Sequence, residues 1–220
     1  MRSVLIDWLI DVHLKFKLRP ETLYLAVNLI DRYIACAFIP KHNLQLVGIA
    51  SLYIAAKYEE IRPPPLKNFL YVTDDAYDKE ELIEMEGKIV NSLKFKLTVP
   101  TARFFFERFG RTSRLTDKGM SLGYFVLDSM LTDFKVMRHV PSLLAMAAVF
   151  IACRVESREG WRSSSTRTPY SEISEVRDCV SEILASLNSN ERSALSAAAE
   201  RKHPISKLLI SSKPTIQDKQ

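Results

Sequence analysis

The segment that most constrains the fold of this chain runs from Leu44 to Pro65, with the sequence LQLVGIASLYIAAKYEEIRPPP. Its apolar residues lie almost all the way round a helix, which predicts a helix that is buried on every side or that spans a membrane. The segment is too short to span a membrane, and it ends in charged residues (Lys57, Glu59, Glu60) before a run of prolines stops it. Its small residues allow neighbouring helices to approach closely, so we expect the central helix of an all-helical bundle.

Composition and cysteine usage narrow the class of protein. The chain has 220 residues, of which 47% are hydrophobic, enough for one large domain or for two domains of about 100 residues each. The net charge of +5 permits acidic partners without requiring nucleic acid. Cys36, Cys153 and Cys179 are odd in number and far apart, so we expect buried, reduced thiols in an intracellular protein. We expect no signal peptide and no membrane span, and a start inside a helix suggests a longer natural protein.

Apolar periodicity and helix-end signals predict five helices on each side of Pro100. Asp78 followed by Glu81 is typical of a capping box at a helix start. The first helix carries two apolar arcs, so it is either wholly buried or has one face turned to a partner. Those arcs consist of Met1, Val4, Leu5, Trp8 and Val12 on one side and of Ile6, Ile10 and Leu14 on the other. The expected helices cover 1–16, 20–34, 44–60, 66–72 and 78–93, then 100–109, 116–132, 141–157, 171–187 and 190–202.

An internal repeat organises the chain. A shift of 97 positions lays Asp31 on Asp128 and Ala50 on Ala147, and it aligns two helices and the loop between them without a gap. Two alanine-rich helices could match by chance, but a gapless match of this length favours a true repeat. We therefore predict an all-α protein of two tandem five-helix domains, each built around a buried third helix. The expected domains are 1–97 and 98–205, followed by a polar tail at 206–220.

Three stretches of the sequence carry specific motifs. They are the opening MRSVLIDWLIDVHLKFKLRPETLYLAVNLIDRYI, then LQLVGIASLYIAAKYEEIRPP, and then TDDAYDKEELIEMEGKIVNSLKFKLTVPT. These stretches resemble the cyclins, and among these the mitotic A and B types, in which the opening is close to MRAILVDWLVEVHEKFKL, RPETLYLAVN and DRFL. The similarity is dense to Thr101 and is traceable to about Leu209 through the helix pattern. It implies tandem cyclin-box domains and a nuclear and cytoplasmic regulatory subunit, not an enzyme, that activates a cyclin-dependent protein kinase.

The resemblance gives a role to one group of residues in the first half. From the residues alone, Lys57 and Glu86 are two solvated charges, or a local ion pair worth at most about 1 kcal/mol. In cyclins, the lysine and glutamate at these positions hydrogen-bond to the kinase near its mobile C-helix. The implied kinase-binding residues are Lys57, Glu86, Val90, Phe95, Leu97, Glu60 and Ile61, with Glu59 beside them. Core packing is the alternative for the apolar members of this set.

A second group follows the first helix. The implied residues are Met1, Val4, Leu5, Trp8, Asp11 and Gln45. In mitotic cyclins this face is a groove for short Arg-x-Leu motifs of substrates or inhibitors, in which an acid pairs with the basic residue and an apolar pocket takes the leucine. Core burial is the alternative, although the second apolar arc argues against it. Val4 and Asp11 depart from the usual isoleucine and glutamate, which leaves the preferred motif open.

The residues suggest no catalytic centre, metal site or cofactor. The four histidines lie in separate segments, and no phosphate-binding glycine motif occurs. The serine run at 163–165, near Arg158 and Arg162, is either a phosphorylated loop or a solvated one. A general transcription factor that shares the double fold and binds DNA is the alternative function. That class would need a basic face on the second repeat, and salt-sensitive DNA binding would identify it.

Overall fold

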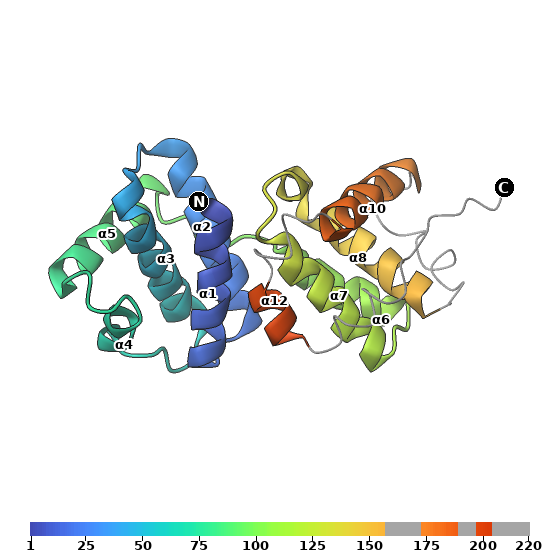
Figure 1. Cartoon of the computed structure of the whole chain (residues 1–220), viewed down its shortest axis with the longest axis horizontal. Helices are drawn as coiled ribbons and strands as arrows, with labels where there is room; N and C mark the ends of the chain where they lie inside the picture. Colours follow the sequence, from blue (N-terminus) through green and yellow to red (C-terminus); the bar gives the residue numbers. More distant parts are fainter. Residues whose placement is uncertain (157–172, 189–196, 204–220) are drawn as a thin grey trace. The chain divides into compact units, whose positions relative to one another are not determined.

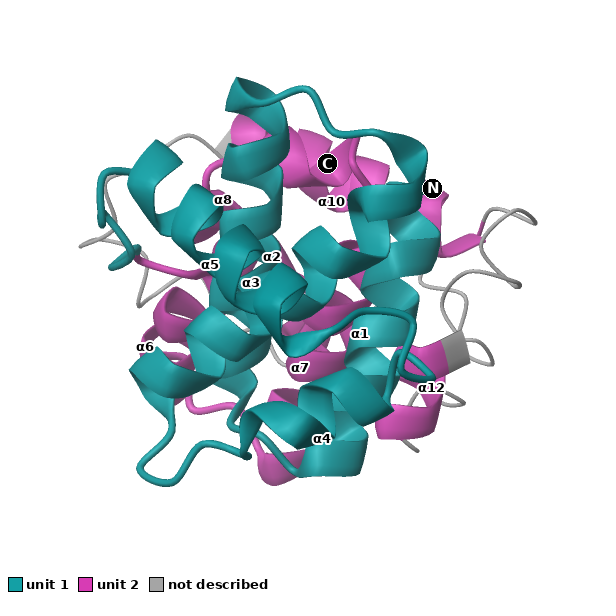
Figure 2. Cartoon of the chain, turned by 90° about the vertical axis from the view of Figure 1, so that its left-hand side faces the viewer, with its two compact units in different colours: residues 1–99 teal, residues 100–220 magenta. Residues whose placement is uncertain are grey.

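The computed structural model of the chain describes residues 1–156, 173–188 and 197–203. It forms two compact units, residues 1–99 and 100–220, which Figure 1 shows along the sequence and Figure 2 in separate colours. All the regular structure in the described ranges is helical, which confirms the all-α prediction. In these ranges, no helix is both long and apolar enough to cross a membrane.

The first unit is built around α3, as the sequence predicts. Its elements are α1 (Arg2–Phe16), α2 (Pro20–Cys36), the short 3₁₀ helix η1 (Lys41–Asn43), α3 (Leu44–Glu59), α4 (Leu66–Tyr71) and α5 (Lys79–Ser92). Helix α3 contacts each of the other four α-helices of the unit. Buried side chains surround it on all sides, among them Leu46, Val47, Ile49, Leu52 and Ile54. The expected capping box is present, because Asp78 accepts from the Glu81 backbone N–H and Glu81 accepts from that of Asp78.

The two apolar arcs of α1 are both buried over most of their length. Ile6 and Ile10 are fully buried, but Leu5 and Val12 of the other arc are buried as well. Leu5 packs directly on α3, where a Cβ added to Gly48 would lie 2.7 Å from the Leu5 Cδ1. Gly48 is therefore the residue that lets α1 approach α3 closely. In this arc only Met1 and Val4 are exposed, so the apolar surface is confined to the start of the helix.

The second unit repeats the arrangement around α8. Its described elements are α6 (Ala102–Thr112), α7 (Asp117–Met130), the 3₁₀ helix η2 (Val136–Arg138), α8 (Pro141–Val155), α10 (Ile173–Asn188) and α12 (Ala197–Lys202). Helix α8 contacts α6, α7 and α10, and α12 packs on α7. Under the 97-residue shift α8, α6, α7 and α10 take the places of α3, α1, α2 and α5, respectively. The prediction of two domains, each around its buried third helix, is confirmed.

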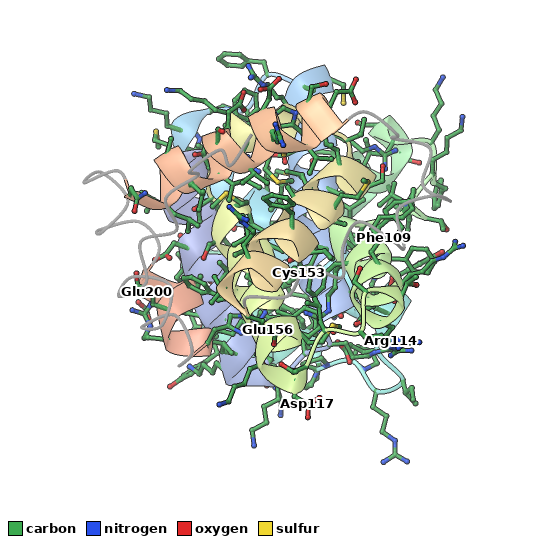
Figure 3. All side chains as sticks on the ribbon, turned by 90° about the vertical axis from the view of Figure 1, so that its right-hand side faces the viewer. Phe109, Arg114, Asp117, Cys153, Glu156 and Glu200 are labelled. Carbon is green, nitrogen blue, oxygen red and sulfur yellow. The ribbon has the colours of Figure 1, made fainter. Side chains whose placement is uncertain are left out.

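In each unit, the glutamate that directly follows the central helix binds the start of the second helix. Glu60 directly follows α3, and its Oε1 accepts hydrogen bonds from the Arg19 backbone N–H (2.7 Å) and from the Thr22 hydroxyl (2.6 Å) at the start of α2. Glu156 directly follows α8 and accepts from the hydroxyl of Thr116, the N-cap residue of α7. Figure 3 labels Glu156 and also Asp117, the first residue of α7. Both carboxylates thus lie at the positive end of a helix dipole, where negative charge is stabilising.

An aspartate of the second helix is also paired with basic residues in both units. In the first unit Asp31 accepts from Arg2 Nε (2.6 Å) and Nη2 (2.8 Å). In the second unit Asp128 is fully buried, and its Oδ2 lies 2.8 Å from Lys202 Nζ and 2.7 Å from His203 Nε2. Burial alone would raise the pKa of Asp128, but the hydrogen bond from His203 and the neighbouring positive charges lower it well below its usual value. Asp128 therefore fixes α12 to α7.

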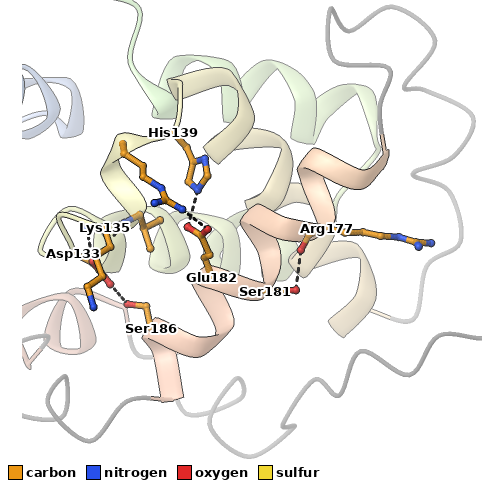
Figure 4. A network of polar contacts seen from close by, with 9 residues as sticks. Asp133, Lys135, His139, Arg177, Ser181, Glu182 and Ser186 are labelled. Carbon is orange, nitrogen blue, oxygen red and sulfur yellow. Dashed lines mark hydrogen bonds and ion pairs between the residues drawn. The ribbon is translucent and has the colours of Figure 1, made fainter.

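A polar network fixes α10 to the segment around η2 (Figure 4). Arg138 Nη2 donates to Glu182 Oε1 (2.5 Å), and His139 Nε2 lies 2.8 Å from Glu182 Oε2. Ser186 donates to Asp133 one turn further along α10. The contact with His139, followed by the charge of Arg138, lowers the pKa of Glu182. These contacts are exposed or half-buried, so they set the position of α10 more than they stabilise it.

The thiols follow the prediction only in part. Cys153 and Cys179 are buried, and burial, with a smaller effect of the Glu182 charge, raises the pKa of Cys179 to about 12. Cys36 is exposed at the end of α2, so its expected burial is wrong. The apolar face of α2 has already ended at Tyr33, which is buried. The serine run at 163–165 and the tail at 206–220 lie outside the described residues.

Candidate functional site

Lys57 and Glu86, which lie 29 residues apart in the sequence, meet in the first unit. Lys57 lies in the last turn of α3 and Glu86 in the middle of α5, and the Lys57 Nζ forms an ion pair with the Glu86 Oε1. The Nζ also lies 4.3 Å from the centroid of the Tyr53 ring, close enough for a cation–π contact. The two side chains remain 39% and 20% exposed. A pair this exposed contributes about 1 kcal/mol or less, so a partner that offers new hydrogen bonds can reach it at low cost.

The segment after α5 lies beside the end of α3. The Tyr58 hydroxyl, next to Lys57 in the chain, shares a hydrogen bond with the Thr98 hydroxyl. Val90 in the last turn of α5 and Leu97 after it are half-buried, whereas the Phe95 side chain is 68% exposed. Core packing therefore accounts for part of Val90 and Leu97 but not for Phe95.

Two further residues of the predicted set take different positions. Ile61 is 92% exposed, directly after the end of α3. The Glu60 carboxylate is already engaged at the start of α2 by Arg19 and Thr22. Glu60 therefore has a structural role that sequence reasoning did not assign, although its position after the central helix could have indicated a helix-end partner.

The predicted groove residues lie on α1 and at the start of α3. Met1 and Val4 are exposed, Trp8, Asp11 and Gln45 are half-buried, and Leu5 is almost fully buried against Gly48. Since α1 packs on α3, the two elements that carry this set are neighbours. Leu5 could therefore contribute only a small part of its side chain to the bottom of such a groove, and the groove itself stays a prediction.

One residue of this region was missed. The Arg32 Nη1 on α2 donates to the Lys96 carbonyl (2.8 Å), which ties α2 to the segment after α5. The target is a backbone atom 64 residues away, so no side-chain pattern in the sequence could have indicated this contact.

The end of α3 and the segment in and after α5 thus combine a charge pair, Lys57 and Glu86, with the exposed side chains of Tyr58, Ile61 and Phe95. That mixture is typical of protein–protein contacts, in which large apolar side chains are buried and charged groups fix the orientation. Among residues 1–156, 173–188 and 197–203, no group of three His, Cys, Asp or Glu side chains could hold a metal ion.

Comparisons with protein families cover both units. The family model described as "Cyclin, N-terminal domain" matches residues 1–98, and that described as "Cyclin, C-terminal domain" matches residues 100–214. The chain is 41% identical over 195 residues to Cyclin-A1-2 of Arabidopsis thaliana and 43% identical over 191 residues to Cyclin-B1-3 of the same plant. Each match covers 86% of this chain but only 44% and 46% of those proteins, respectively. The chain thus spans less than half the length of these curated relatives.

Solved structures share the fold. A viral cyclin from herpesvirus saimiri superimposes with a TM-score of 0.66 at 20% identity, over 90% of this chain and 85% of the viral one. A chain of the yeast RNA Pol II CTD kinase CTDK-1 complex gives a TM-score of 0.72 at 17% identity, over 87% of this chain and 66% of that one. At these identities the likeness establishes the fold alone.

Proposed function

Because the chain belongs to the cyclin family, we propose that it is a regulatory subunit that activates a cyclin-dependent protein kinase and has no catalytic activity of its own. The observation that carries the proposal is the Lys57–Glu86 pair, which is half-exposed and lies on the same unit as the exposed Phe95. The cyclin family implies kinase contacts at these positions. The 41–43% identity to A- and B-type plant cyclins supports a mitotic type.

The proposed mechanism is a population shift in the kinase. The first unit packs on the kinase C-helix and holds it inward, which brings the kinase's own Glu–Lys pair together and helps to order its activation loop. Lys57 and Glu86 exchange part of their mutual contact for hydrogen bonds to the kinase, and Phe95 and Ile61 become buried. The kinase provides ATP, magnesium and the chemistry. An interface above about 2,000 Å² is usual for a signalling pair of this kind.

Substrate recruitment is a second part of the proposal. Met1, Val4 and Trp8 form the apolar part of a groove for Arg-x-Leu motifs, and Asp11 pairs with the basic residue of the motif. Val4→Ala combined with Trp8→Ala should weaken the phosphorylation of motif-bearing substrates and leave that of a motif-free peptide unchanged. An equal loss for both substrates would contradict a recruitment role.

Residence in both nucleus and cytoplasm is likewise proposed, and imaging of the tagged natural protein tests it.

A kinase assay tests the main proposal. The chain is mixed with a monomeric cyclin-dependent kinase, and phosphate transfer to a histone-like substrate is followed. Wild-type chain should raise the activity strongly, and Lys57→Ala with Glu86→Ala should abolish the rise without loss of helicity. The matched control is Glu84→Ala with Lys88→Ala, which removes the exposed ion pair one turn apart on α5 (2.7 Å). Full activation by the Lys57/Glu86 variant would refute the site, and no complex with any such kinase would refute the function.

A further inference from the structure

The turn that follows α5 has a backbone conformation that its residues disfavour. Lys94 has a φ of 53° and Phe95 a φ of 56°, so two successive residues with side chains lie in the left-handed region. That region is unfavourable for residues other than glycine, and least so for asparagine and aspartate. Such a conformation persists only where the surrounding structure fixes it, and it is found preferentially at functional sites.

Hydrogen bonds within the segment fix the amide groups of the turn. The Lys94 N–H donates to the Asn91 carbonyl (2.9 Å) and the Phe95 N–H to the Val90 carbonyl (2.9 Å). The N–H groups of Lys96 and Leu97 donate to the carbonyls of Leu93 and Phe95, each at 3.0 Å. All these partners lie within the last turn of α5 or within the turn itself. These backbone hydrogen bonds therefore tie the turn to its own helix and not to the rest of the unit.

Arg32 provides a contact from another helix. Its Nη1 donates to the Lys96 carbonyl at 2.8 Å, while its other described hydrogen bond, to Asn28 Oδ1 at 3.4 Å, is long and stays within α2. Lys96 is the residue next to Phe95, so the guanidinium fixes the backbone directly beside the exposed ring. Arginine suits this task because its planar group keeps a fixed donor geometry.

The fixed turn presents an aromatic side chain to solvent. Phe95 is 68% exposed, although phenylalanine is normally among the more buried residues. A large apolar side chain that is held in its binding position loses less conformational entropy when a partner covers it. The strained backbone and the exposed ring together indicate an anchor prepared for a partner.

We propose that Arg32 is a positioning residue, which holds the 94–97 turn so that Phe95 is ready to bind the kinase. The inference rests on the proposed function, because it takes the kinase as the partner that covers Phe95. Arg32 acts through the Lys96 carbonyl and needs no contact of its own with the kinase. Replacement of Arg32 should therefore weaken kinase binding only when Phe95 is present.

A double-mutant cycle on the whole chain tests this dependence. The variants are Arg32→Met, Phe95→Ala and the two combined. For each variant, the dissociation constant is measured for the monomeric cyclin-dependent kinase that the wild-type chain activates. Phe95→Ala should weaken binding by about 30-fold or more, as expected for a hot-spot side chain. Arg32→Met should weaken it about tenfold in the wild-type background but less than about twofold in the Phe95→Ala background. The control Arg108→Met, on the exposed face of α6, should leave the constant unchanged.

Additive losses in the cycle, or unchanged binding by Arg32→Met, would overturn the proposal. Amide hydrogen exchange of the free chain gives a readout that needs no kinase. Arg32→Met should speed exchange at Phe95, Lys96 and Leu97 by about tenfold and leave the middle of α2 and of α5 unchanged. Unchanged exchange in the turn would show that Arg32 does not hold it, whatever the kinase does. Failure of the wild-type chain to bind or activate a kinase would instead refute the proposed function.

Discussion

Replacement of Asp128 by alanine removes the carboxylate that Lys202 and His203 both contact, at 2.8 and 2.7 Å. The Asp128 side chain is fully buried, and those of Lys202 and His203 are only 10% and 14% exposed. Removal of one member of a buried ion pair costs about 3–5 kcal/mol, because the remaining charge stays buried without it. At about 2–4 °C per kcal/mol for a chain of this size, the melting temperature of the second unit should fall by about 6–20 °C.

The internal repeat provides the matched control for this experiment. Asp31 occupies the equivalent place in the first unit and pairs with Arg2, but its side chain is 30% exposed and that of Arg2 is 16% exposed. Water can replace part of the lost contact there, so Asp31→Ala should cost clearly less than Asp128→Ala. Calorimetry of both variants measures the difference. A larger loss for Asp31→Ala, or a loss below about 1 kcal/mol for Asp128→Ala, would refute the assignment of a buried, charge-paired carboxylate.

The pH dependence follows from the lowered pKa of Asp128. A carboxyl whose pKa is lower in the folded state stabilises fully above its unfolded pKa, near 3.8, and loses that contribution as the pH falls toward the folded value. The difference in melting temperature between wild type and Asp128→Ala should therefore be full at pH 6 and should shrink as the pH falls below about 4. A difference that grows in acid would contradict the sign.

Three further substitutions test the packing and the helix ends. Gly48→Ala should destabilise the first unit by about 1–3 kcal/mol, because the added Cβ would lie 2.7 Å from the Leu5 Cδ1. Gly87→Ala on α5 should instead stabilise the unit by about 0.5–1 kcal/mol, because its added Cβ would have no atom within 4 Å. Asp78→Ala should cost about 1 kcal/mol through loss of the capping box. Urea unfolding measures each effect, and a stabilising Gly48→Ala or a neutral Asp78→Ala would contradict the close α1–α3 contact or the capping box, respectively.

Residue patterns predicted the fold far better than they predicted the surface. The helix ranges, the repeat and the central helix follow from apolar periodicity, which depends on burial, and burial dominates folding. For the candidate site, the sequence singled out Lys57, Glu86 and Phe95 through resemblance. It could not give the role of Arg32, because that side chain binds a backbone carbonyl 64 residues away, and a residue pattern carries no information about backbone groups. The role of Glu60 was not assigned either, although its position after the central helix could have indicated a helix-end partner.

Cys36 illustrates the same limit from the other direction. Its position at the end of an apolar helix suggested burial, but the helix face that packs on the core has already turned away at this point. Apolar periodicity identifies the buried face in the middle of a helix. It is a poorer guide to burial in the last turn, where the chain leaves the core.

The glutamate that follows each central helix has a consequence for local motion. Helix ends usually fray, so a charged side chain in the last turn of a helix samples many positions. Here the end of α3 can open only if Glu60 also leaves the start of α2, so the two helix ends open together or not at all. Lys57 lies in that last turn. The fluctuations that would scatter its ammonium group are thereby coupled to the opening of a second helix about 40 residues away in the chain, which makes them rarer than at an ordinary helix end.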